Sequence, residues 1–350
     1  MSRLLSKANC LALLPLLIAS IFGGSPIKYA KPKLSDYGFF EGPMADHNPG
    51  PSVMPYDISA KLFSDYALKS RFIALPKGQQ LVYQKDGTFK FPQESVLIKT
   101  FYYPNNFRNS DQGSRLIETR LLINTQEGWI GFPYVWNSEQ TEAYLEIAGK
   151  RLNVSFIDPA GQPINFEYSV PNFNQCKGCH VNQNRTIPIG PKVRLLNHDF
   201  DYDDGKMNQL VKWNMLDMIK GLPSVSSLPH TPDYNDLESG SIEERARALI
   251  DINCAHCHRL GAPGETSGLF LNIEETDPTR LGIHKPPVAA GRGSGDLDYT
   301  IVPQYPNQSI MIYRMESTDP GIMMPELGRK LVHKEGVELV KKWIQEMEKQ

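Results

Sequence analysis

The sequence predicts an α+β multidomain protein, in which an antiparallel β-rich N-terminal domain precedes a helical segment and an all-α C-terminal domain. Short runs of strand-forming residues separated by turns fill the stretch from about 56 to 170. After Pro171 the apolar residues recur at helical spacing instead. The length of 350 residues fits two or three compact domains.

Residues 1–25 have the composition of a secretory signal peptide. Arg3 and Lys7 precede the apolar run Leu11–Phe22, and small residues follow it. The run is shorter than the ~20 residues of a spanning helix, so we expect cleavage and export to the periplasm or the medium. No later stretch is apolar enough to span a membrane. The net charge of -2 offers no basic excess for nucleic acid.

Residues 26–55 are rich in proline and glycine and predict an extended lead-in. The β-rich domain is expected at 56–170, beginning with a hairpin whose tight turn is Asp86–Gly87. Further strand-like runs predict an antiparallel sandwich or barrel-like domain; they lie at 95–103, 115–123, 128–136, 143–149, 151–157 and 164–170.

The rest of the chain divides into segments 171–240 and 241–350. In the first, apolar positions that include Met215 and Met218 predict a helix over 207–222. In the second, Ser241 and Glu244 form a capping box that opens a helix through Asn253. A closing amphipathic helix is expected at about 334–348.

Two C-x-x-C-H motifs carry the chemistry. They are Cys176-Lys-Gly-Cys179-His180 and Cys254-Ala-His-Cys257-His258, and they contain four of the five cysteines. Thiols at this spacing can reach the two vinyl groups of one porphyrin, and the adjacent histidine then lies under the iron. The sequence therefore predicts two covalently bound haem c groups, with four cysteine anchors and with His180 and His258 as proximal iron ligands.

Other uses of C-x-x-C pairs fit less well. Zinc ribbons space their pairs by ~15–20 residues, whereas 74 residues lie between Cys179 and Cys254. A redox dithiol is expected in a thioredoxin-like alternation of strands and helices, which is missing. His256, inside the second motif, is expected to point away from the iron and to be a supporting or surface residue.

Residues 241–350 resemble a class I cytochrome c domain. The resemblance rests on a helix running into the second motif, on Met324-Pro325 in the stretch GIMMPELG, and on a final helix with Trp343. It implies that Met324 is the distal ligand of the second haem, with Met323 or Met315 as substitutes. A thioether ligand opposite histidine raises the reduction potential.

The sixth ligand of the first haem is left open by the sequence. Met215 and Met218 are candidates, although core packing is the better explanation for both; Met207 and His198 are others. The β-rich domain could also supply the ligand, or the site could have none.

The whole chain resembles an uncharacterised family of exported bacterial dihaem cytochrome c-like proteins. The matching stretches are Lys99–Phe101, Glu118–Leu122, Pro188–Lys192, Leu196–Asn197, Met323–Arg329 and Trp343–Ile344. The resemblance implies no established activity.

The charged residues of the predicted strands, Lys99, Glu118 and Arg120, are expected on a solvated sheet face. The aromatics Trp129, Tyr134 and Trp136 are expected in the core.

These features predict a periplasmic protein that relays single electrons from a donor dehydrogenase to a terminal acceptor. A haem enzyme, peroxidase-like or oxidase-like, is the alternative: its first haem would have an open sixth site, and the β-rich domain would form part of the pocket. A third possibility is a haem-bearing binding module whose β-rich domain recognises a carbohydrate or a protein.

Overall fold

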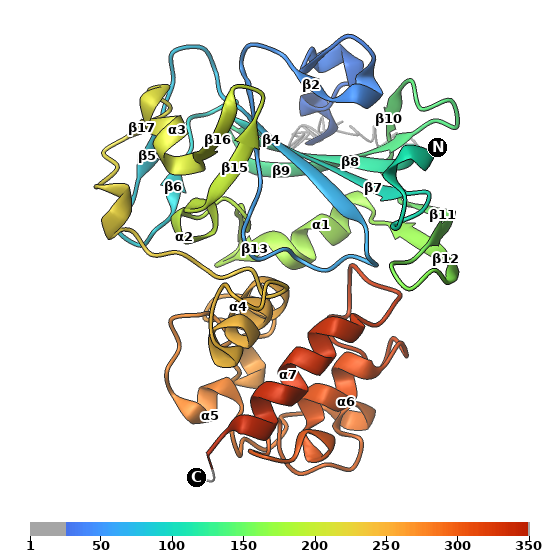
Figure 1. Cartoon of the computed structure of the whole chain (residues 1–350), viewed down its shortest axis with the longest axis vertical. Helices are drawn as coiled ribbons and strands as arrows, with labels where there is room; N and C mark the ends of the chain where they lie inside the picture. The colour runs from blue at the N-terminus through green and yellow to red at the C-terminus, as the bar shows by residue number, and fades with distance from the viewer. Residues whose placement is uncertain (1–25, 349–350) are drawn as a thin grey trace, which may run out of the picture.

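The computed structural model describes residues 26–348, so the predicted signal peptide lies outside the described residues. The central element is a six-stranded antiparallel sheet in the order β10-β9-β8-β7-β4-β3 (Figure 1). Its strands are β3 (Val53–Tyr56), β4 (Leu68–Ala74), β7 (Val96–Pro104), β8 (Ser114–Thr125), β9 (Gly128–Trp136) and β10 (Ala143–Leu145).

Smaller sheets surround the central one. Four are two-stranded hairpins: β1 (Phe40–Glu41) with β2 (Asn48–Pro49), β11 (Lys150–Ile157) with β12 (Pro163–Val170), β13 (Val181–Asn182) with β14 (Arg185–Thr186), and β15 (Asp199–Tyr202) with β16 (Gly205–Asn208). The fifth joins β5 (Leu81–Tyr83), β6 (Phe89–Lys90) and β17 (Ile219–Lys220). The predicted hairpin at Asp86–Gly87 is confirmed as the β5–β6 pair.

The α-helices are short. They are α1 (Phe173–His180), α2 (Val193–Leu196), α3 (Gln209–Met215), α4 (Ile242–Cys254), α5 (Pro278–Leu281), α6 (Ile310–Glu316) and α7 (Lys334–Glu346). The predicted capping box is confirmed, because Ser241 accepts from the Glu244 amide and the Glu244 side chain accepts from Ser241. Helix α7 confirms the closing helix.

The two faces of the central sheet contact different parts of the chain. One face carries Ile98, Leu121 and Phe132, which are at most 1% exposed and pack with Leu34 and Phe40 of the N-terminal segment. The other face carries Leu97 and Leu122, which belong to one apolar cluster with residues of α4 and α7. Helix α1 lies on this second side, between the sheet and the C-terminal helices (Figure 1).

The loop between β3 and β4 fastens the C-terminal part to the sheet. The buried Asp65 carboxylate accepts from the amides of Lys330 at 2.6 Å and Leu331 at 2.7 Å. The Phe63 amide donates to the Asn253 side chain on α4 at 2.8 Å. Paired buried polar groups fix the relative position of the segments that carry them.

The predicted fold class is wrong in its helical parts. The chain is β-rich, with 28% strand and 26% helix, and segment 171–240 contains β13 to β17 as well as short helices. Residues 241–348 form no all-α cytochrome c-like domain: α4 and α7 have 13 residues each, but α5 and α6 are short and long loops join them. The apolar cluster that contains residues of α4 and α7 also includes Tyr56 on β3 and Ile73 on β4. Residues 241–348 therefore do not enclose a separate hydrophobic core.

The helix predicted over 207–222 is also shorter than expected. It ends at Met215, and its buried residues are Gln209, Leu210 and Trp213. The following residues turn back, with the Met218 amide donating to the Trp213 carbonyl, and enter β17. Pairing of β17 with β5 outweighs the helical periodicity there. Among residues 26–348, no helix is both long and apolar enough to cross a membrane.

Candidate functional site

Helix α1 presents the first cysteine motif on one face. Its N-terminus is closed by a capping box in which the Asn172 side chain accepts from the Gln175 amide at 2.9 Å. Cys176, Cys179 and His180 stand at positions i, i+3 and i+4, so their side chains lie on the same side of the helix. A Cβ added at Gly131 on β9 would lie 3.2 Å from the Cys176 Cβ, so the sheet approaches α1 closely there.

The second motif occupies the end of α4 and the turn that follows. Cys254 is the last residue of the helix, and the amides of Cys257 and His258 both donate to its carbonyl, at 3.1 and 2.9 Å. Gly264 packs against this turn, since a Cβ there would lie 3.0 Å from His258 Nδ1. The glycine therefore leaves the space that the imidazole occupies.

The two motifs, 74 residues apart in sequence, meet in space. The Cys257 thiol donates to the Gly178 carbonyl of α1 at 3.8 Å. The interaction of the Cys179 and Cys257 thiols lowers the pKa of Cys179 and raises that of Cys257. The chemistry of both motifs is therefore concentrated in one region between the sheet and the C-terminal helices.

Both motif histidines have their Nδ1 atom engaged by the protein. His180 Nδ1 lies 2.8 Å from the Ile187 carbonyl, to which it can only donate. His258 Nδ1 lies 3.1 Å from the Ser267 hydroxyl, whose own proton is donated to the Gly264 carbonyl. Within residues 26–348 neither Nε2 atom has a hydrogen-bond partner. Burial lowers the pKa of both imidazoles to about 4 and keeps them neutral, as an iron ligand must be.

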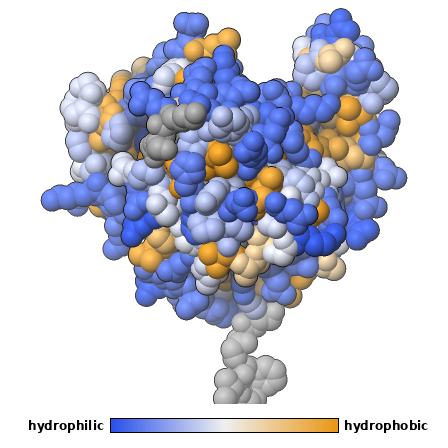
Figure 2. All heavy atoms as spheres, turned by 90° about the horizontal axis from the view of Figure 1, so that it is seen from below, coloured by the Kyte–Doolittle hydropathy of each residue, from blue (hydrophilic) through white to orange (hydrophobic). Residues whose placement is uncertain are grey.

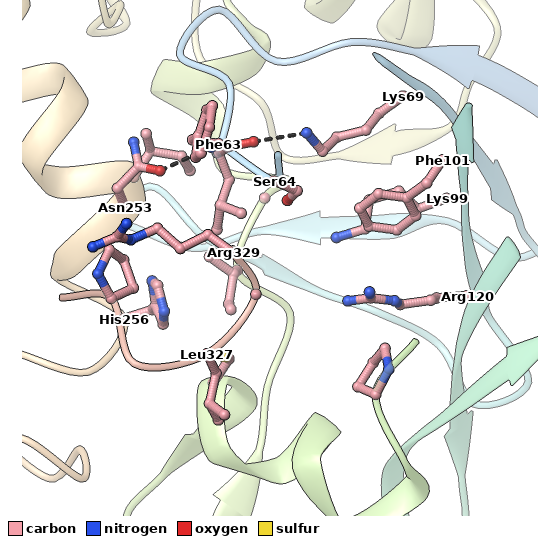
Figure 3. Close-up of a pocket in the computed structure, with 18 of the residues that line it drawn as sticks. Phe63, Ser64, Lys69, Lys99, Phe101, Arg120, Asn253, His256, Leu327 and Arg329 are labelled. Atoms are coloured by element: carbon pink, nitrogen blue, oxygen red, sulfur yellow. Dashed lines mark hydrogen bonds between the residues drawn. The ribbon is translucent and has the colours of Figure 1, made fainter. Parts of the chain in front are cut away.

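A cavity of about 310 Å³ lies beside the first motif. Cys176, Cys179 and His180 line it on one side, and Cys254, His256 and Met324 line it from the C-terminal part. In Figure 3 the side chains of Lys69, Lys99 and Arg120 project from the sheet toward His256 and Arg329 across the cavity. The volume falls in the range of small-molecule and cofactor sites, ~300–1,000 Å³.

The expected solvated sheet face is in fact the wall of this cavity. Glu118 is fully buried; its carboxylate accepts from Arg120 at 2.5 and 2.9 Å and from the Tyr168 hydroxyl at 2.5 Å. Burial, followed by the charges of Arg120 and Arg71, lowers the pKa of Lys99 to about 7. The sequence shows these charged residues, but not that α1 and the C-terminal loops cover them.

The predicted distal ligands are divided between two regions. Met324 lines the cavity together with Met323 and Met315, whereas His258 and Cys257 are outside its lining. Met215 is 69% exposed, and neither it nor Met218 lines the cavity. The fold therefore places these two candidates for the first haem away from Cys176 and Cys179.

His256 is 7% exposed, so it is not a surface residue. It lines the cavity, and its buried Nδ1 atom has no hydrogen-bond partner among the described residues. Of the aromatics expected in the core, Tyr134 and Trp136 are buried, and Trp129 packs against the main apolar cluster while partly exposed.

The cysteines do not form a metal cluster. All four are free, and no group of three or more histidine, cysteine or acidic side chains within residues 26–348 is arranged to hold a metal ion. A tetrathiolate zinc site requires four converging sulfur ligands.

Among residues 26–348, the outer face of the C-terminal part is mixed in polarity. Viewed from this side, single apolar residues are scattered among hydrophilic ones (Figure 2). A stable, obligate interface would need a larger continuous apolar area.

Comparisons with known proteins identify no relatives: no family model matches the chain, and no curated protein or solved structure is significantly similar to it.

Proposed function

We propose that the chain is an exported dihaem c-type cytochrome that relays single electrons in the periplasm, between a donor dehydrogenase and a terminal acceptor. The observation that carries the proposal is the state of the two motif histidines. Each is half-buried and neutral, each has Nδ1 bound by a protein oxygen, and each leaves Nε2 without a partner among residues 26–348. This is the arrangement that protein-bound metals require of a ligating imidazole.

The residues for covalent attachment fit the same proposal. The thiols of each motif are free, and those of the first motif line a cavity of about 310 Å³. Haem c supplies reversible one-electron chemistry at its iron when bound. The protein holds the histidines neutral and contributes Met324 to the cavity wall.

The contact between the motifs favours a relay over two independent centres. The Cys257 thiol reaches the Gly178 carbonyl between the two cysteines of the first motif. Groups anchored at the two motifs would therefore lie close to each other. Their close approach supports electron exchange within one chain.

Haem stoichiometry tests the proposal. The full chain is expressed with a cytochrome c maturation system and examined by intact mass and by its pyridine haemochrome spectrum. We expect two covalent haems, and one in each of the paired variants Cys176→Ser/Cys179→Ser and Cys254→Ser/Cys257→Ser. A single haem that survives the first pair of substitutions contradicts a two-centre relay.

A haem enzyme is a second candidate, and the cationic cavity beside the first motif favours it. An open site that binds a small substrate needs accessible volume and polar groups that orient the substrate. A carbon monoxide difference spectrum of the reduced protein separates the two functions. Binding of carbon monoxide supports an open site, whereas an unreactive spectrum supports the relay.

A further inference from the structure

The cavity face of the central sheet carries a row of like charges. Lys99 on β7 stands directly opposite Arg71 on β4 and opposite Arg120 on β8. Lys69 lies on the same face, two residues before Arg71, and all four side chains line the cavity. Like charges directly opposite each other on neighbouring strands destabilise a sheet. Negative charge nearby would stabilise the charged forms of these side chains.

The protein supplies only part of that negative charge. Arg71 pairs with Asp57 at 2.5 Å, and Arg120 pairs with Glu118 at 2.5 Å. Lys69 donates to the carbonyls of Leu62 and Ala67, which carry no net charge. The remaining member, Lys99, has no hydrogen-bond or ion-pair partner within residues 26–348.

The opposite wall adds further positive charge. Arg329 is 5% exposed, and its guanidinium donates to carbonyls, including those of Ser317 and Met324. The cationic lining residues are Lys69, Arg71, Lys99, Arg120, Arg329 and Lys330, against Asp65 and Glu326. Even with Asp57 and Glu118 behind the wall included, six basic side chains face four carboxylates.

The free donors of Lys99 and Arg120 point to one kind of ligand. Arg120 uses Nε and Nη2 on Glu118, which leaves Nη1 without a partner within the described chain. Both cations flank the Phe101 ring, with Lys99 Nζ at 5.1 Å and the Arg120 guanidinium carbon at 4.3 Å from its centroid. Figure 3 shows the three side chains on the same wall. Two adjacent cationic donors match the two oxygens of a carboxylate.

We propose that Lys99 and Arg120 form a carboxylate-binding site in this cavity. The inference builds on the proposed function, because a haem anchored at Cys176 and Cys179 carries two propionates. A small diffusible carboxylate is the other source of the same chemistry. In either case the bound anion neutralises the row of cations and satisfies the free donors of Lys99 and Arg120.

The test compares Lys99→Met with Lys90→Met in the full haem-loaded chain. Lys90 is an exposed strand lysine on β6 and serves as the matched control. Formate is the probe, and two quantities are measured: the thermal midpoint as a function of formate concentration, and the midpoint potential of each haem. Lys99→Arg retains the charge and should behave as the wild type.

The outcomes distinguish the two sources. If the anion is diffusible, formate stabilises the wild type in a saturable way, and Lys99→Met raises the apparent Kd about tenfold or more, as loss of a charged hydrogen bond predicts. If it is a propionate, formate has no effect, but Lys99→Met lowers the midpoint potential of one haem, because removal of a cation favours the oxidised iron. The Lys90 control changes neither quantity.

The proposal is overturned if Lys99→Met matches Lys90→Met in both measurements. Haem content by intact mass is recorded for every variant, so failure of this site is distinct from failure of the proposed function. A chain without covalent haem still reports on the site through the formate titration.

Discussion

Replacement of Glu118 by glutamine tests whether the cationic wall depends on the buried carboxylate of Glu118. Glu118 is fully buried and pairs with Arg120, which is 27% exposed at its side chain. Loss of one partner from a buried pair costs roughly 3–5 kcal/mol. Because Arg120 retains some contact with water, we expect Glu118→Gln to lower the free energy of unfolding by about 3 kcal/mol, at the lower end of that range.

Equilibrium unfolding in urea, followed by far-UV circular dichroism, measures the change. Glu167→Gln is the control, since Glu167 pairs with Arg151 at 3.2 Å on exposed strands, with side chains 52% and 76% exposed. Exposed pairs contribute ~0–1 kcal/mol. The double variant Glu118→Gln/Lys99→Met should recover part of the loss, because it removes a neighbouring cation. Equal effects of Glu118→Gln and the control would refute the reasoning.

Three further predictions follow from the structure. Asp251→Asn should lower the free energy of unfolding by roughly 3–5 kcal/mol, because Asp251 pairs with the buried Arg194 at 2.6 Å; urea unfolding measures it, and a loss below that of Glu167→Gln contradicts it. Gly264→Val should displace the His258 ring, since even a Cβ would lie 3.0 Å from Nδ1; the haem spectrum should show altered ligation at one centre, and an unchanged spectrum counts against the assignment. Burial, partly opposed by Glu335 and reinforced by Lys69 and Arg329, lowers the pKa of His333 to about 4. The unfolded chain therefore binds more protons than the folded chain between pH 6.5 and 4, and stability is lost as pH falls through that window. His333→Gln should reduce this loss, measured by urea unfolding at each pH. The same pH dependence in the variant and the wild type would contradict the prediction.

Local signals in the sequence predicted local structure well. The capping box at Ser241 and Glu244 defines the start of α4, and Asp86–Gly87 defines the β5–β6 turn. Both depend on residues within a few positions of each other, which is where backbone preferences act. The C-x-x-C-H pattern also identified the candidate site from residues within five consecutive positions.

Long-range packing explains what the sequence did not predict. The all-α C-terminal domain was wrong because residues of α4 and α7 share their apolar cluster with the sheet instead of enclosing a core alone. The solvated face expected for Glu118 and Arg120 was wrong because the covering segment, α1, comes some 50 residues later in the chain. Alternation along a strand shows that two residues share a face, but not what lies over that face.

If the first motif binds haem as proposed, the charges of the cavity wall should affect the reduction potential of that haem. Cations close to a haem favour its reduced, less positive state, so an unneutralised wall at Lys99 and Arg120 would raise the potential of the first centre. A carboxylate bound at that wall would lower it again. The potential of the first centre should therefore respond to occupation of the site, whereas His258, held by Ser267 outside the cavity lining, should be less affected. Unequal responses of the two centres to formate, or to Lys99→Met, are the expected signature of this arrangement.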